Sequence, residues 1–597
     1  MRRTNVVVTL LASLVLLYPS GARAEEGSLF REAVRSEGGV VASESPEAAE
    51  AGLEILDEGG NAVDAAVATA FAIGVAQPQS CGIGGGGFMV YRGADGEANA
   101  LDFRETAPAA INADAFQGDG IYTAYTGHKT VGVPGTVAGM QAALDRYGTL
   151  SLAETVAPAA RLAREGFEVP ESLSESMGES QGRLELFPAA REQYLVDGER
   201  PYEPGSILVQ KDLADTLAAI AEDGPDAFYR GEIADKIVSS MENAGDYPGD
   251  EGLMTRQNLE DYEAVWREPV RGEYRGHDVI GMPAPSSGGI AVLQMLGILE
   301  GYDLEEMGQS SADTLHVLAE AQKIAFADRE EYVADPGFAE VPAREILAED
   351  YAEQRRGDIK MDEAKPSYEP GDFGGAGGGS GGGDNPEGST THISVIDAEG
   401  NAVALTCTIE QSFGSAVVAP GTGFLLNNEL TDFSDPGAAN EPEPGKRPRS
   451  SMSPTIVVRD GEPVLVVGGS GGSQIIMGAL HAVINTVDFG HDPARAIDAA
   501  RLDAQFPPEL ILEDGRVSAT AESDLISRGH VPVSEGEYSD VPLVQAAGTD
   551  PQTGERLAAT DPRSGPQAST GQGTAPLPHT GGIPFPGCGL LPDWTPC

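Results

Sequence analysis

Hydrophobic and polar residues alternate along two neighbouring stretches in the second half of the chain, at residues 391–397 and 402–408. Such alternation is typical of strands with one face buried, and Glu399-Gly400-Asn401 supplies turn-forming residues between them. A second hairpin is predicted at 454–459 and 463–468, across Asp460-Gly461, and another strand at 423–427. This half of the chain is therefore predicted to contain antiparallel sheet.

Helical periodicity dominates elsewhere, and glycines mark several helix boundaries. The predicted helices cover 47–56, 62–75, 136–147, a segment opening at 283–289 and running to 299, 312–328 and 473–487. Residues 150–270 alternate helical patterns with acidic loops. Strands and helices together predict an α+β protein.

Glycine-rich segments divide the chain. Residues 371–383 are almost entirely Gly, Ser and Ala, a composition that predicts a flexible linker. The glycines at 82–87 precede the strand predicted at 88–91, whereas a dinucleotide-binding turn follows a strand and opens a helix. They are instead expected to permit close backbone approach. Residues 564–597, rich in Pro, Gly and Thr, are predicted to form a disordered tail.

The N-terminus and the charge bear on location and partners. Residues 1–24 combine Arg2 and Arg3, a short apolar run and small residues before a cleavage point, which predicts a secretory signal peptide. No later stretch is apolar for long enough to span a membrane. The net charge of −56 is spread along the chain, which argues against nucleic-acid binding and predicts a saline habitat, where salt screens self-repulsion.

The cysteines and histidines give no pattern for a metal or a cofactor. Cys81 and Cys407 lie in apolar contexts and are expected to be buried thiols, while Cys588 and Cys597 are close enough in the tail to pair. The eight histidines show no ligand spacing. Neither a transition metal nor a cofactor is predicted.

A threonine lies where the linker meets the first strand, in Gly388-Ser389-Thr390-Thr391-His392, and other motifs accompany it in a fixed order. They are Gly60-Asn61-Ala62-Val63-Asp64-Ala65-Ala66, Phe103-Arg104-Glu105-Thr106-Ala107-Pro108, Pro285-Ser286-Ser287-Gly288-Gly289, Thr406-Cys407-Thr408, Asn427-Asn428-Glu429-Leu430-Thr431-Asp432-Phe433, Arg447-Pro448-Arg449-Ser450-Ser451-Met452-Ser453-Pro454 and Gly469-Ser470-Gly471-Gly472-Ser473. With these blocks the sequence resembles the γ-glutamyltranspeptidases over about residues 28–563.

The resemblance implies the four-layer αββα sandwich of N-terminal nucleophile hydrolases and cleavage between Ser389 and Thr390. It implies a large subunit (25–389, ending in the linker 371–388) and a small catalytic subunit (390–563) that associate as a heterodimer. The physical chemistry agrees, because a terminal threonine offers both a hydroxyl nucleophile and an α-amine able to accept its proton. Thr408 would orient the Thr390 hydroxyl. The backbone N–H groups of Gly471 and Gly472 would form an oxyanion hole.

The resemblance also implies how a γ-glutamyl group would be held. Arg104, with Ser450 and Ser451, would bind the α-carboxylate. Glu429 and Asp432 would bind the α-ammonium, and Glu410, where many members have Asn, would make that pocket more acidic. The connection at 434–445 is short, which predicts an open site that admits bulkier or polymeric donors.

Three functions are compatible with this sequence. The first is a secreted, self-cleaving γ-glutamyl hydrolase and transferase acting on glutathione and other γ-glutamyl amides, with water, amino acids or peptides as acceptors. The second is a related acylase or poly-γ-glutamate depolymerase using the same threonine. The third is a non-catalytic secreted binding protein. Arg104, Glu429 and Asp432 favour the first, since a glutaryl side chain has no α-ammonium to bind.

Overall fold

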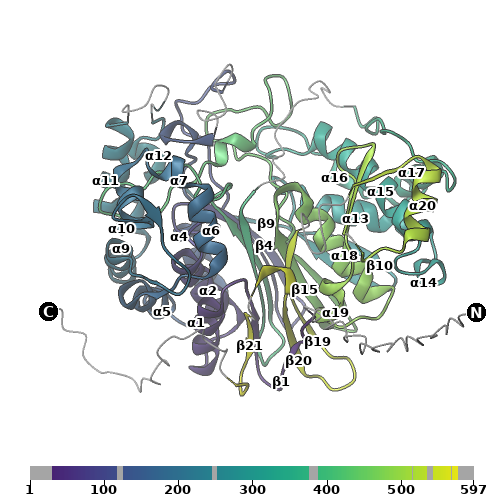
Figure 1. The fold of residues 1–597 in the computed structure, drawn as a ribbon, viewed down its shortest axis with the longest axis horizontal. Helices are drawn as coiled ribbons and strands as arrows, with labels where there is room; N and C mark the ends of the chain where they lie inside the picture. The colour runs from purple at the N-terminus through teal and green to yellow at the C-terminus, as the bar shows by residue number, and fades with distance from the viewer. Residues whose placement is uncertain are drawn as a thin grey trace, which may run out of the picture.

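The computed structural model describes residues 30–116, 125–244, 250, 252–374, 388–513, 515–533, 542–565 and 568–575. Two central sheets lie between two groups of helices (Figure 1). Among the described residues, no helix has the length and apolar character needed to cross a membrane. The signal peptide predicted at 1–24, most of the linker and the tail cysteines lie outside the described residues.

Each central sheet has seven strands. The first contains, in spatial order, β1 (Val34–Ser36), β20 (Arg556–Thr560), β19 (Leu543–Thr549), β15 (Glu462–Ser470), β14 (Thr455–Arg459), β11 (His277–Gly281) and β10 (Val270–Tyr274). The second contains β21 (Ser569–Gly571), β2 (Val40–Ala42), β12 (Thr390–Ile396), β13 (Ala402–Thr408), β3 (Gly86–Arg92), β4 (Ala98–Asp102) and β9 (Val265–Arg267).

Helices cover the outer face of each sheet (Figure 1). Beside the second sheet lie α1 (Pro46–Asp57), α2 (Ala62–Ala76), α4 (Thr136–Tyr147), α5 (Leu152–Glu165), α9 (Lys211–Asp223), α10 (Pro225–Tyr229) and α11 (Glu232–Glu242). Beside the first lie α13 (Gly288–Leu299), α15 (Ala312–Tyr332), α17 (Glu349–Asp358), α18 (Ile475–Val487), α19 (Pro493–Asp498) and α20 (Ala519–Arg528).

Three buried clusters separate these layers. A small one, including Val90, Ala404 and Ile456, fills the space between the two sheets. Two larger ones pack each sheet against its helices. Because both faces of each sheet are covered, every residue of the central strands β12 and β13 is buried, including the polar residues that alternate with apolar ones. The result is the predicted αββα arrangement.

Most predicted elements are confirmed, including the hairpins β12–β13 and β14–β15 and the helices α1, α2, α4, α13, α15 and α18. The strand predicted at 423–427 is wrong. Gly421 and Gly423 take positive φ, and only an isolated bridge joins Val418 to Leu425. The disordered tail is wrong at its start, because Ser569–Gly571 forms β21 and pairs with β2.

The expectation of buried free thiols at Cys81 and Cys407 is also wrong, because the two form a disulfide with Cα atoms 5.6 Å apart. Their sequence separation of 326 residues concealed the pairing. Cys407 lies on the helix-facing side of β13, where the chain just after α2 brings Cys81 against it. Both residues are buried as predicted.

Glycines 84–87 provide close backbone approach, as predicted. A Cβ atom on Gly85 would lie 2.0 Å from the carbonyl oxygen of Thr408, and one on Gly84 would lie 2.0 Å from that of Leu425. Neither distance is physically possible for a side chain. The glycine run therefore allows β3 and the loop before it to press against β13 and the loop at Leu425.

Candidate active site

The pairing of β12 with β13 places the proposed nucleophile. Thr390 is the first residue of β12 and lies opposite Thr408, the last residue of β13. Opposed residues of an antiparallel pair project to the same face of the sheet. Thr391 lies opposite Cys407, so alternation sends it to the other face, where the disulfide lies. The register thus separates the two adjacent threonines.

The Thr408 hydroxyl connects the groups around the Ser389–Thr390 peptide bond. It accepts a hydrogen bond from the Thr390 hydroxyl, with the two Oγ1 atoms 3.2 Å apart. It donates to the carbonyl oxygen of Ser389 at 3.0 Å and accepts from the backbone N–H of Glu410 at 2.8 Å. The Ser389 backbone N–H in turn donates to the Glu410 carbonyl oxygen at 2.6 Å. The proposed nucleophile and the carbonyl group it would attack are therefore both hydrogen-bonded to one hydroxyl.

Arg104 lies two residues beyond the end of β4 and is only 1% exposed. Its guanidinium forms ion pairs with Glu429 and Asp432, and Glu105 Oε2 is 3.8 Å away. It also donates to the carbonyl oxygens of Pro448, at 3.3 Å, and Arg449, at 3.0 Å. In this structure the predicted carboxylate-binding group and the predicted ammonium-binding groups therefore pair with each other.

Four carboxyl groups, those of Glu105, Glu410, Glu429 and Asp432, lie near Arg104. Burial raises the pKa of Glu410 well above its ordinary value, and the nearby Asp432 adds to the rise, while Arg104 and Arg183 oppose it. Burial likewise raises the pKa of Glu429, although Arg104 opposes it, and brings that of Glu105 to about 7. Glu410 Oε2 and Glu429 Oε2 are buried without hydrogen-bond partners. Such a group of carboxyls favours the arrival of another cation.

The predicted anion-binding groups lie across the same cavity. Gly471 and Gly472 take φ values of 120° and 56°, which glycine adopts without strain, and they lead into α18. Ser450 donates its backbone N–H to the Pro285 carbonyl oxygen at 3.1 Å. The Ser451 hydroxyl accepts from Arg329 at 2.7 Å. Gly472, Ser450 and Ser451 thus border the space beside Thr390.

One cavity collects nearly all the predicted residues: Arg104, Thr390, Thr408, Glu410, Glu429, Asp432, Ser450, Ser451 and Gly472 line it. Gly471 and Ser389 are the chain neighbours of lining residues. Arg449 and Ser473 also line the cavity; both lie inside the motifs given above, but neither was predicted to be a site residue. Ser80 was not predicted either, and its hydroxyl oxygen lies 3.0 Å from that of Ser389. No sequence signal linked Ser80 to a residue 309 positions away.

Two stacked antiparallel sheets between helices, with a threonine at the start of a central strand, define an N-terminal nucleophile hydrolase. Residues 48–571 match the family described as Gamma-glutamyltranspeptidase. The chain belongs to this family.

Individual relatives agree with this assignment. The chain is 42% identical to the "Glutathione hydrolase proenzyme" of Escherichia coli, over 89% of this chain and 91% of the relative. It is 40% identical to the "Acylase ACY 1 proenzyme" of Pseudomonas sp. (strain SE83), over 82% and 87%. The cephalosporin acylase structure from Bacillus halodurans superposes with a TM-score of 0.81 at 30% identity, covering 94% of this chain and 99% of that one.

Proposed function

We propose that this protein is a self-cleaving γ-glutamyl hydrolase and transferase acting on glutathione and other γ-glutamyl amides. The observation that carries the proposal is the hydrogen-bonded set of Thr390, Thr408 and the Ser389 carbonyl, beside the buried Arg104 and the carboxylates paired with it. The first feature suits acyl transfer to threonine. The second suits a zwitterionic acyl group.

Self-cleavage would begin with attack of Thr390 Oγ1 on the carbonyl carbon of Ser389. As the C–N bond breaks, the amide nitrogen takes up a proton and the acyl group moves to the oxygen. Water then hydrolyses the ester and leaves Thr390 with a free α-amine. Thr408 supports the step, since its hydroxyl donates to the oxygen that becomes negative. The new amine would then serve as the base in γ-glutamyl transfer.

Substrate binding would exchange one set of ion pairs for another. The α-carboxylate of the donor would take Arg104 from its acidic partners, with Ser450 and Ser451 as further donors. The α-ammonium would then pair with Glu429, Asp432 and Glu410. Because the donor brings one charge of each sign, this exchange leaves the net charge of the pocket unchanged. The γ-carbonyl oxygen would face the backbone N–H groups of Gly471 and Gly472 as its carbon is attacked by Thr390.

A cephalosporin-type acylase is the second candidate, because relatives named as acylases are about as similar as those named as glutathione hydrolases. A glutaryl group carries no ammonium, so it would leave the carboxyls of Glu410, Glu429 and Asp432 without a cation. The charge of the pocket therefore favours γ-glutamyl donors. A polymeric γ-glutamate donor remains compatible with the short 434–445 segment. Comparable rates on glutathione and poly-γ-glutamate would support an open site, and inactivity on the polymer would refute it.

Replacement of the two adjacent threonines tests the central claim. Thr390→Ala is expected to abolish both chain cleavage on a reducing gel and hydrolysis of a γ-glutamyl anilide. Thr391→Ala is the matched control and is expected to retain both, since its side chain lies on the other face of β12. Cleavage without Thr390 would overturn the proposal. Added glycylglycine then separates transfer from hydrolysis.

A hydroxyl swap at position 408 tests the supporting role. Thr408→Val is expected to slow chain cleavage by about 10²–10³-fold, the effect typical of losing one donor to a developing oxyanion. Thr408→Ser keeps the hydroxyl and is expected to cleave at a rate close to that of the wild type. The rates come from reducing gels of freshly purified precursor over time. Equal rates for the two variants would contradict the role.

The boundaries proposed for the mature protein follow from this chemistry. Export would remove residues 1–24, and cleavage would give a large subunit (25–389) and a small subunit (390–563 with the following β21) that stay together as a heterodimer. Mass spectrometry of the two bands tests both ends. A small subunit beginning at Thr390 and a large subunit beginning near Glu25 are expected.

A further inference from the structure

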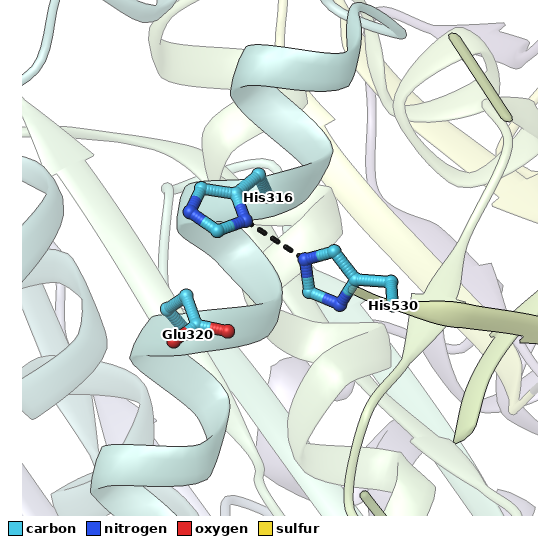
Figure 2. A group of neighbouring side chains, drawn as sticks. All are labelled: His316, Glu320 and His530. Atoms are coloured by element: carbon cyan, nitrogen blue, oxygen red, sulfur yellow. Dashed lines mark hydrogen bonds between the residues drawn. The ribbon is translucent and has the colours of Figure 1, made fainter. Parts of the chain in front are cut away.

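Three buried side chains from distant parts of the chain meet outside the proposed active site (Figure 2). His316 and Glu320 come from successive turns of α15, and His530 follows the end of α20. One ligand atom from each, a ring nitrogen or a carboxylate oxygen, lies within 4.8 Å of the others. We propose that His316, Glu320 and His530 form a binding site for Zn²⁺ or a similar divalent transition metal.

The donor set suits such an ion. Two imidazole nitrogens and one carboxylate oxygen are ligands typical of zinc, and residues four apart on a helix project from the same face. His530 is fixed in place because its backbone N–H donates to the Leu525 carbonyl oxygen, 3.2 Å away, just beyond the positive-φ Gly529. The three donors therefore come from rigid backbone.

Hydrogen bonds orient the first ring for coordination. His316 Nε2 lies 2.8 Å from the Lys360 carbonyl oxygen. A carbonyl oxygen only accepts, so Nε2 carries the proton and Nδ1 of the neutral ring has a free lone pair. A metal-ligating histidine commonly donates its second N–H to a backbone carbonyl in this way. His316 is thus already in the tautomer that binds metal through Nδ1.

The second ring requires one tautomer shift. His316 Nδ1 is 2.8 Å from His530 Nε2, the hydrogen bond drawn in Figure 2, so in the metal-free protein His530 Nε2 donates to His316. Metal binding would move that proton to His530 Nδ1 and expose the Nε2 lone pair. The net protonation of the pair would not change. The ion would replace the hydrogen bond between the rings.

The Glu320 carboxylate already has hydrogen-bond and ion-pair partners, and a bound metal would have to displace one of them. Glu320 Oε2 accepts from the Tyr368 hydroxyl at 2.7 Å and from the Lys365 backbone N–H at 3.2 Å. Glu320 Oε1 forms an ion pair with Lys323. Lys323 also donates to the Lys365 carbonyl oxygen at 2.6 Å, so it keeps a partner if a metal displaces it from Oε1. Lys323 is therefore the group that competes with the ion.

The three ligands come from both sides of the proposed cleavage point, which indicates a role for the site in holding the subunits together. His316 and Glu320 precede the proposed cleavage point at Thr390, whereas His530 follows it. A bound ion would therefore join the two proposed subunits. It would stabilise their association at the outer helix layer, away from the nucleophile.

Zinc titration of the processed, chelator-treated protein, monitored by calorimetry, tests the site. Elemental analysis after gel filtration then measures how much zinc stays bound. One zinc per chain is expected. Three variants remove one ligand each, and zinc affinity is expected to fall by more than about tenfold in every one: His316→Gln, His530→Gln and Glu320→Gln. Even replacing a residue that only hydrogen-bonds to a ligand can cause a loss of that size. His491→Gln, a histidine outside the cluster, is the matched control and is expected to leave the affinity unchanged. Lys323→Gln is expected to tighten binding.

Two further measurements separate metal binding from folding and from the proposed function. Each variant's thermal midpoint is compared with and without zinc, so that a variant weakened by its mutation serves as its own reference. Thr390→Ala is expected to bind zinc as the wild type does, because the cluster does not depend on cleavage. No stoichiometric zinc in the wild type would overturn the site. Equal binding by wild type and all three ligand variants would overturn it too.

Discussion

Glu410 combines a left-handed backbone with a buried carboxyl group. Its φ is 76°, a conformation that Asn tolerates better than Glu, and its side chain is only 5% exposed. Its backbone nevertheless holds the site, since its N–H donates to Thr408 and its carbonyl oxygen accepts from Ser389. Glu410 therefore lowers the stability of the folded protein while it adds a carboxyl group to the pocket.

Replacing Glu410 is expected to stabilise the protein in a pH-dependent way. Burial raises the pKa of this carboxyl in the folded state, so the folded protein holds a proton that the unfolded chain releases. The free energy of unfolding therefore falls as the pH rises from about 4.3, the ordinary Glu value, toward the folded pKa, with a slope of about 1.4 kcal/mol per pH unit. Glu410→Gln removes this loss. Its advantage over the wild type is expected at pH 8 and absent at pH 4.

Urea unfolding at several pH values measures this effect, in a Thr390→Ala background so that the chain stays in one piece. Glu410→Asn separates the backbone contribution from that of the charge, because its advantage should persist at pH 4. An unchanged pH profile in Glu410→Gln would show that the carboxyl is ionised at little cost.

At the scale of elements, the contact between β13 and the glycine loop just before β3 bears on the position of Thr408. A side chain at Gly85 would strike the Thr408 carbonyl oxygen and push β13 outward. Gly85→Ala is therefore expected to lower the free energy of unfolding by about 1–3 kcal/mol, as overpacking does, and to stop chain cleavage by displacing Thr408. Gly357→Ala in α17 meets no atom within 4 Å and is the control. Urea unfolding and a reducing gel report the two effects.

The same elements show what the sequence can reveal. The alternation in 391–397 and 402–408, with a short turn between them, was enough to predict the β12–β13 hairpin whose register opposes Thr390 and Thr408. The positions of Arg104, Glu429 and Asp432 in one site came from motif resemblance, because local pattern carries no information about contacts 325 residues apart. The ion pairs that these three side chains form with one another could be seen only in the three-dimensional structure. β21 was missed because a three-residue edge strand in a Pro- and Gly-rich segment has little local signal.

At the scale of the whole molecule, the Cys81–Cys407 disulfide crosses the proposed cleavage point, since Cys81 lies before Thr390 and Cys407 after it. The two subunits are therefore expected to remain covalently joined after processing. A non-reducing gel should show one band, and reduction should give two. Cys81→Ser is expected to give two bands on both gels. Two bands from the wild type without reductant would mean that the disulfide does not form.

The net charge of −56 predicts that the stability of the whole protein depends on salt. Like charges repel across the folded surface, and the screening length falls from about 10 Å at 0.1 M salt to about 3 Å at 1 M. The unfolded chain spreads the same charges further apart, so screening favours the folded state more. The urea midpoint of the Thr390→Ala precursor is therefore expected to rise between 0.1 M and 2 M sodium chloride. Urea is the suitable denaturant because guanidinium is itself a salt.

Buried ion pairs should respond differently from the surface charge. Arg104 with Glu429, and Arg501 with Asp561, are sequestered from solvent and little screened by added ions. The salt response is therefore expected to come from exposed carboxylates. Sucrose at matched osmolality supplies the control, since it strengthens burial without screening charge. An equal gain in sucrose and in salt would contradict an electrostatic origin, and with it the proposed saline habitat.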